Sequence, residues 1–179
     1  MEATEITARR IVGEAPDRAF VGSAWRVHWR RVEATDWSLS LRSSGRYHRG
    51  QDLFSTDEIW PVLYTSTAPE VAIWEMVRRS ASRNLEYLKN NILTELDVRL
   101  DRVLDLTHLT VMERYTAHLT GPDFHLCQEI ASLARSRHFQ GLLVPSAALE
   151  GMNLVITPDN LSDASDLKVV RSSELPIDF

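Results

Sequence analysis

The stretch Val62-Leu63-Tyr64-Thr65-Ser66-Thr67, which leads directly into Ala68-Pro69-Glu70, decides the fold class. Its β-branched and aromatic residues are typical of a strand. Thr67 as N-cap, with Glu70 three residues later, has the form of a capping box and predicts a helix over about Ala68–Ser80. The apolar residues of that segment point in almost every direction at 100° per residue, so we expect a helix buried on most sides, with Glu75 as the exception.

Short strand patterns and one further helix pattern occupy most of the rest of the chain. Strands are predicted at Ala24–Trp29, Leu96–Leu100, Val103–Leu106, Leu142–Val144, Asn153–Ile156 and Leu167–Val170. Asp123 can cap a helix over about Phe124–Arg137, which Gly141 would end. Helices and strands do not alternate as in a doubly wound sheet, so the predicted class is α+β, a single domain over residues 1–179 with a mixed sheet.

The composition is that of an ordinary globular protein. The chain has 179 residues, 44% hydrophobic and 25% charged. No stretch has the 18 or so apolar residues of a membrane helix, and the start MEATEITARR carries charges where a signal peptide is apolar. We therefore expect a cytoplasmic protein without a membrane segment. The single cysteine, Cys127, cannot form an internal disulfide and lies on the apolar face of its predicted helix.

Charge is unevenly distributed. The net charge of −5 argues against direct nucleic-acid binding, which depends on neutralising phosphates. Between Ala24 and Gly50, however, the sequence contains six arginines and only two acidic residues. This run is either a solvated basic face or a site for phosphate or carboxylate groups, which arginine binds through two parallel hydrogen bonds.

Common catalytic motifs are missing. There is no HExxH, GxSxG, Rossmann or Walker sequence, and the six histidines are poorly spaced for a metal, so surface or capping roles are expected for them. Glu75 is either paired with Arg78 or Arg79 or functional. Tyr64 is either a core aromatic or a stacking surface, and Ser146 by itself is typical of a turn.

Five fragments, in this order, resemble the RES domain. They are Gly45-Arg46-Tyr47-His48-Arg49-Gly50, Pro61 to Ser66, Ala72-Ile73-Trp74-Glu75, Gly141 to Ser146, and Asn153-Leu154-Val155. Arg46, Glu75 and Ser146 occupy the places of the Arg, Glu and Ser that name the family. Arg26 and Tyr64 match its early arginine and its strand tyrosine. The resemblance covers about residues 25–156. The family loop commonly reads GGRW with Asn, where this chain has Ser44-Gly45-Arg46-Tyr47-His48.

The resemblance implies a bacterial toxin with an ADP-ribosyltransferase-like fold that destroys NAD by hydrolysis or phosphorolysis. Its implied partner is an Xre-type helix-turn-helix antitoxin. NAD would be a substrate, with inorganic phosphate as a possible co-substrate, and no cofactor or metal would be permanently bound. Glu75, Arg46 and Ser146 would be catalytic, and Arg26, Tyr47 and Tyr64 would bind substrate. This fits the chemistry, because a fixed carboxylate can stabilise the positive charge that develops on ribose.

Two alternatives stay open. One is transfer of ADP-ribose to a protein or metabolite. The other is a non-catalytic domain whose arginines bind nucleic acid or an acidic protein. The segment Phe54–Trp60 could also serve a homodimer or antitoxin interface, since aromatic residues are common both in interfaces and in cores.

Overall fold

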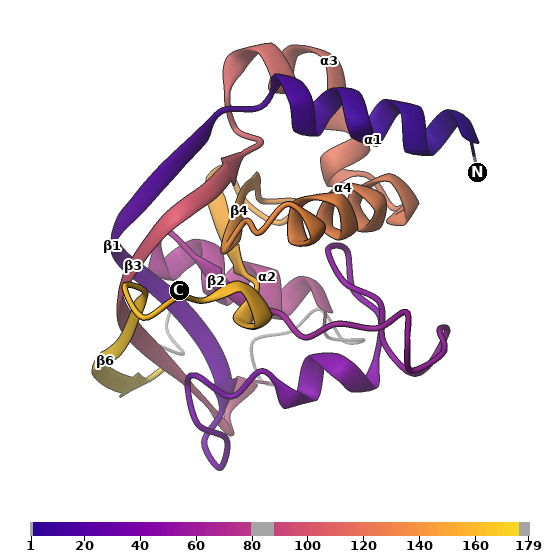
Figure 1. Ribbon diagram of the computed structural model, residues 1–179. Coiled ribbons are helices and arrows are strands. Elements are labelled where there is room, and N and C mark those ends of the chain that lie inside the picture. The colour runs from indigo at the N-terminus through magenta and orange to yellow at the C-terminus, as the bar shows by residue number, and fades with distance from the viewer. Residues whose placement is uncertain (1, 80–87, 176–179) are drawn as a thin grey trace.

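The computed structural model describes residues 2–79 and 88–175, and its described strands form one mixed sheet (Figure 1). The strands are β1 (Asp17–Trp29), β2 (Leu63–Ser66), β3 (Asn91–Asp105), β4 (Gly141–Pro145), β5 (Met152–Ile156) and β6 (Asp166–Glu174). Their order is β1-β2-β5-β4-β3-β6. Only β3 and β4 pair in parallel within the described sheet. The predicted α+β class with a mixed sheet is confirmed.

β1 and β3 are the two longest described strands of the sheet and pair with each other along most of their lengths. They pair antiparallel from Asp17 opposite Leu104 to Trp29 opposite Asn91. β1 also meets β2, where Trp25 lies opposite Ser66, so the pairings run from β1 through β2, β5, β4 and β3 back to β1. This arrangement places β2 beside the second half of β1, with β5 on the other side of β2.

The helices form two groups. α1 (Glu2–Glu14), α3 (Leu109–Thr120) and α4 (His125–Ser136) gather at one end of the molecule (Figure 1). Their buried apolar faces share one core cluster with β4 and β5, in which Ile11, Leu119 and Ile130 are fully buried. α2 (Pro69–Arg79) packs instead on β1, β2 and β5, with Ile73 and Val77 in a separate cluster. The site described below lies beside α2.

The strand–helix unit predicted from residues 62–80 is present, with two differences. The helix covers Pro69–Arg79, and Ser80 lies outside the described residues. Trp74 is 40% exposed, so the helix is less buried than expected. The Thr67 hydroxyl donates to the Met152 carbonyl at 3.2 Å, which ties the start of α2 to β5.

Other element boundaries needed correction. The two strands expected at 96–100 and 103–106 belong to the single strand β3, which ends at Asp105, because β3 pairs with β1 on both sides of an irregularity at Asp101 and Arg102. Gly141 does not end α4; it is the first residue of β4, and the chain leaves the helix at His138, whose φ is 60°. Asp123 does accept a hydrogen bond from the His125 N–H at 2.9 Å.

Helices α1 and α3 were not expected from the sequence. Their buried apolar residues are few, and most of their surface is polar, so the periodic signal is weak. Among the described helices, none is both long enough and apolar enough to cross a membrane.

We predict that Ile11→Ala lowers the free energy of unfolding by about 2–5 kcal/mol, because it leaves a cavity between α1 and the shared core. Ile11 is fully buried, whereas Ile6 on the same helix is 53% exposed. Ile6→Ala is therefore the matched control, expected within about 0.5 kcal/mol of wild type. Urea unfolding followed by circular dichroism measures both. Equal effects of the two substitutions would contradict the packing of α1.

Candidate active site

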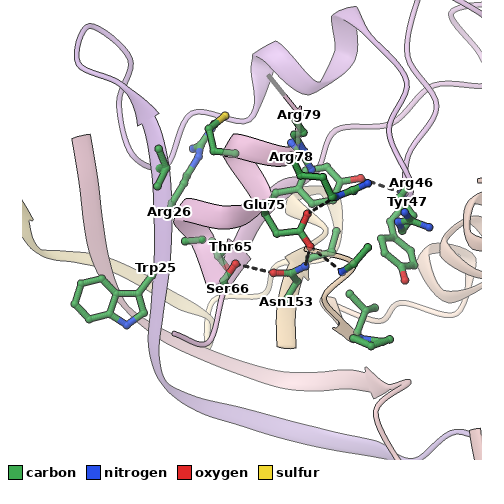
Figure 2. A pocket seen from close by; sticks show the side chains of 18 residues that line it. Trp25, Arg26, Arg46, Tyr47, Thr65, Ser66, Glu75, Arg78, Arg79 and Asn153 are labelled. Carbon is green, nitrogen blue, oxygen red and sulfur yellow. Dashed lines mark hydrogen bonds and ion pairs between the residues drawn. The ribbon is translucent and has the colours of Figure 1, made fainter. Parts of the chain in front are cut away.

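Glu75 is held by hydrogen bonds from two other parts of the chain (Figure 2). Its Oε1 accepts from Ser146 Oγ at 2.7 Å, from the Ala147 N–H at 3.0 Å and from Asn153 Nδ2 at 2.8 Å. Its Oε2 lies 3.4 Å from Arg78 Nε. The carboxylate is thus fixed between α2, the turn after β4, and β5.

The hydrogen bonds determine the charge of Glu75. Burial by itself raises the pKa of this carboxyl group, but the hydrogen bonds from Ser146 and Asn153, the charge of Arg78 and the Ala147 N–H together outweigh burial. The pKa of Glu75 therefore lies below its ordinary value. At neutral pH the group is a carboxylate.

Two further contacts keep the donors in place. Ser66 Oγ on β2 donates to Asn153 Oδ1 at 2.6 Å, which orients the amide so that its nitrogen faces Glu75. Ser146 Oγ accepts from the Ala148 N–H at 3.1 Å, so the turn holds the hydroxyl that donates to Glu75. Ser146 is therefore a neighbour that positions the carboxylate.

Arg46 reaches the same cavity from the loop before β2, and its side chain is nearly fully buried. Its guanidinium donates to the carbonyl oxygens of Gly121 at 2.6 Å and Thr120 at 3.3 Å. The guanidinium carbon also lies 4.5 Å from the centre of the Phe124 ring. The turn between α3 and α4 thus holds Arg46 in place.

The loop that carries Arg46 is compact. Gln128 on α4 donates to the Gly45 carbonyl at 2.9 Å. A Cβ at Gly45 would lie 2.5 Å from His48 Cε1, so the close approach of the His48 ring requires glycine here. Gly45 is therefore required in this loop by the packing of the His48 ring.

Tyr64 and His48 form a hydrogen-bonded pair in the wall of the site. The Tyr64 hydroxyl accepts from the Tyr47 N–H at 2.9 Å and lies 3.0 Å from His48 Nδ1. His48 Nε2 is 2.8 Å from the Ser43 carbonyl, which requires a proton on Nε2 and makes Nδ1 the acceptor of the tyrosine proton. Burial lowers the pKa of His48 and raises the pKa of Tyr64 to about 12, so both groups are neutral at pH 7.

The histidines differ from the expectation in two places. His28 and His48 are buried, although surface or capping roles were expected for all six. Each ring nitrogen of both residues lies within hydrogen-bonding distance of a partner, which makes burial of the neutral ring possible. Cys127 is fully buried, as predicted.

An inner cavity and an outer groove meet at these residues. The inner cavity has a volume of about 60 Å³ and is lined by Glu75, Tyr64 and Asn153, among others. The outer groove, about 440 Å³, runs past Trp37 and Phe124. Both spaces share four arginines: Arg26, Arg46, Arg78 and Arg79. Among the described lining residues of the two spaces, Glu75 is the only carboxylate, so the site favours an anionic ligand.

Arg26 contributes a half-buried cation from β1. Burial lowers the pKa of Arg26 to about 10; the charge of Asp36 raises this pKa, and that of Arg79 lowers it further. The guanidinium also donates to the Ala34 carbonyl. It remains charged at neutral pH.

The arginine-rich run at residues 24–50 does not form one basic face. Arg26 and Arg46 line the site, whereas Arg30 pairs with Glu174 at 2.9 Å. Arg49 bonds to Glu129 and lies between the rings of Phe54 and Trp60. Trp60 is buried, so the aromatic ends of the segment considered for an interface are used within the chain.

Most of the residues singled out from the sequence come together, with differences in how they do so. Glu75, Arg26, Arg46, Tyr47 and Tyr64 line the inner cavity, whereas Ser146 donates to Glu75 without lining that cavity. The Tyr47 side chain is only 2% exposed, and its hydroxyl is 3.5 Å from the Leu119 carbonyl, so its ring is part of the core. Among the described residues, no group of three His, Cys, Asp or Glu side chains could hold a metal ion.

The family model of the RES domain matches residues 23–178. The chain belongs to the RES domain family. A chain of the M. tuberculosis MbcT–MbcA toxin–antitoxin complex has a similar structure, with a TM-score of 0.75 and 22% sequence identity, over 94% of this chain and 91% of that chain. At this identity the likeness concerns the fold. The comparison with curated proteins found no match.

Sequence reasoning missed three residues of this RES site. Asn153 was part of a matching fragment, but nothing in the strand pattern separated its side chain from those of its neighbours. Arg78 and Arg79 were considered only as partners of Glu75. Their position at the end of α2, one turn after Glu75, was the available signal, since residues three and four apart share a helix face.

We predict that Asn153→Ala raises the pKa of Glu75, because it removes a donor that stabilises the charged form. Ser66→Ala should raise it less, since Asn153 keeps its nitrogen but loses an orienting partner. Carbon-13 NMR titration of the labelled Glu75 carboxyl group measures both, with thermal melting as the folding control. An unchanged pKa in a folded Asn153→Ala variant would contradict the role of this amide.

Proposed function

We propose that this RES protein cleaves the bond between nicotinamide and ribose in NAD and passes the ADP-ribosyl group to a small acceptor. One observation carries the proposal: an ionised, immobile carboxylate, Glu75, lies in a cavity whose other charged lining residues are four arginines. NAD is a substrate with matching charges, because its pyrophosphate is anionic and its nicotinamide ring is cationic.

The chemistry requires little from the protein beyond electrostatics. The C–N bond breaks, its electron pair stays on the ring nitrogen, and nicotinamide leaves as a neutral molecule. No acid is needed for the leaving group, unlike in glycoside hydrolysis. Positive charge develops on the ribose, and a fixed carboxylate such as Glu75 stabilises it without reorganising.

The arginines and Tyr64 fit the rest of the substrate. Arg26 and Arg46 can each offer a planar guanidinium to a phosphate group. The face of Tyr64 suits a cationic ring. The inner cavity is too small for a nucleotide, so we place the reacting bond near Glu75 and the adenosine half in the outer groove, whose volume lies in the range of small-molecule sites.

The state of Glu75 favours inorganic phosphate over water as the acceptor. Oε1 already accepts three hydrogen bonds and Oε2 faces Arg78, and the lowered pKa makes the carboxylate a weak base. Water needs a base to become a good nucleophile, whereas phosphate carries a charged oxygen and is attracted by the arginines. Hydrolysis, and transfer to a protein or metabolite, are the alternatives that the product analysis distinguishes.

A role as a toxin follows from the same proposal. Depletion of NAD in the cytoplasm would stop growth, and a cognate antitoxin, expected to be of the Xre type, would neutralise the enzyme. The support is family membership and the shared fold with a chain of a toxin–antitoxin complex. Direct binding of nucleic acid has less support, because the arginines of residues 24–50 are dispersed over pocket, core and surface.

We predict that Glu75→Gln lowers nicotinamide release from NAD by at least about 100-fold, since it removes the charge that stabilises the transition state. Glu70→Gln is the matched control, because Glu70 is exposed in the first turn of the same helix. Proton NMR of the reaction with and without inorganic phosphate identifies the products. A phosphorylated ADP-ribose is expected.

The outcomes separate the alternatives. Free ADP-ribose as the sole product would mean hydrolysis. Release that occurs only with an added protein or metabolite would mean transfer. Full activity in folded Glu75→Gln, or no nicotinamide release by the wild-type protein with any acceptor, would overturn the proposed function.

Trp37 provides a test of the adenosine position. It is 39% exposed and lines the outer groove, where an adenine ring can stack on it. We predict that Trp37→Ala weakens ADP-ribose binding about fivefold or more, as expected for loss of a base–aromatic stack, and leaves binding of nicotinamide mononucleotide unchanged. Trp29→Ala is the control, because Trp29 is 55% exposed and lines neither space. Isothermal titration calorimetry on the Glu75→Gln background measures both ligands.

A further inference from the structure

Arg79 occupies the boundary between the inner cavity and the outer groove. It is the last residue of α2 and lines both spaces. Its guanidinium carbon lies 4.5 Å from the centre of the Tyr64 ring. Figure 2 shows it next to Arg78 at the end of α2. A cation therefore already covers the aromatic face that a cationic ring would use.

The two neighbouring arginines have different environments. Arg78 is paired with Glu75. Arg79 instead interacts with an aromatic ring and lies close enough to Arg26 for their charges to repel, which helps to lower the pKa of Arg26. Its contact with Tyr64 is thus a cation–π interaction in surroundings of like charge, and such an interaction is weak enough to exchange.

We propose that Arg79 is the residue that makes the site selective for a ligand with both a cationic ring and an anionic group. In the structure its guanidinium covers Tyr64. A pyridinium ring displaces it from this face, and the displaced guanidinium then faces an anion in the outer groove. The identity of the ligand, a nicotinamide dinucleotide, rests on the proposed function; the exchange itself rests on the contact between Arg79 and Tyr64.

The physical argument concerns charge on one ring face. The face of a tyrosine ring attracts cations and has room for one. If a neutral ring displaced Arg79, the cation–π interaction at Tyr64 would be lost. A pyridinium that displaced Arg79 would form a new cation–π interaction with the same ring. An anion between Arg79 and Arg26 also relieves their mutual repulsion. Both parts of the ligand therefore favour the same movement of one side chain.

The test uses two fragments that the enzyme cannot cleave. The 1-methylnicotinamide cation carries the pyridinium ring, and ADP carries the anionic pyrophosphate. Removing the positive charge with Arg79→Gln should tighten 1-methylnicotinamide binding about two- to fivefold, because the guanidinium that competes for the Tyr64 ring is gone, and should weaken ADP binding by a similar factor. These opposite signs are specific, since local damage to the site would weaken both ligands.

Arg10→Gln is the control, because Arg10 is exposed on α1 and lines neither space. NMR titration of the wild-type protein and both variants gives the dissociation constants, and thermal melting confirms folding. Weaker binding of both fragments to folded Arg79→Gln, or no change in either, would overturn the inference about Arg79 and leave the proposed function standing. If neither fragment bound the wild-type protein, the inference about Arg79 would fail, and nicotinamide release from NAD would still decide the proposed function. Opposite changes in the two dissociation constants, without cleavage of NAD, would support the inference about Arg79 and overturn the proposed reaction.

Discussion

The structure depends on keeping one carboxylate ionised in a partly buried position. Burial disfavours the charged form of Glu75, and the protein compensates with three hydrogen bonds to a single oxygen and an arginine beside the other. Such a group has almost no freedom to reorient. It is therefore suited to stabilising charge that develops in front of it, and poorly suited to accepting a proton.

The fold makes this arrangement possible by placing three short segments side by side. β2 leads into α2, which carries Glu75, and β2 pairs with β5, which carries Asn153. β5 pairs in turn with β4, whose end leads into the Ser146 turn. The Gly151 carbonyl accepts from the Ser146 N–H at 2.9 Å and closes that turn. Backbone pairing between strands thus sets the positions of the donors to within hydrogen-bonding distance.

The four arginines around Glu75 each interact with different partners, which keeps these like charges apart. Arg46 is fixed by backbone carbonyl groups and the Phe124 ring, whereas Arg26 donates to the Ala34 carbonyl. Arg78 is paired with the carboxylate, and Arg79 lies on Tyr64. Carbonyl oxygens and aromatic faces stabilise a guanidinium without neutralising it, so the positive field of the cavity remains available to a ligand.

The sequence predicted the α+β class, the strand–helix unit around Tyr64 and Glu75, and the order of the motif fragments, because these follow from local patterns of apolar, capping and turn residues. It did not predict α1 and α3, because their small apolar faces give a weak periodic signal and are buried only by packing against the shared core. It also could not distinguish a paired Glu75 from a functional one. The structure shows that Glu75 is paired with Arg78 and bonded to Ser146 and Asn153 at once.

Which chemical groups are available, and which of them share a strand or a helix, can be read from the order of residues alone. Only the tertiary structure decided that Arg46 and Glu75 share a cavity while Arg30 and Arg49 do not, and that Asn153 faces Glu75 rather than solvent. These relations depend on strand pairing and helix packing between residues far apart in the sequence, from Arg46 and Glu75 to Arg30 and Glu174, which are 144 positions apart, and local periodicity carries no information about such contacts.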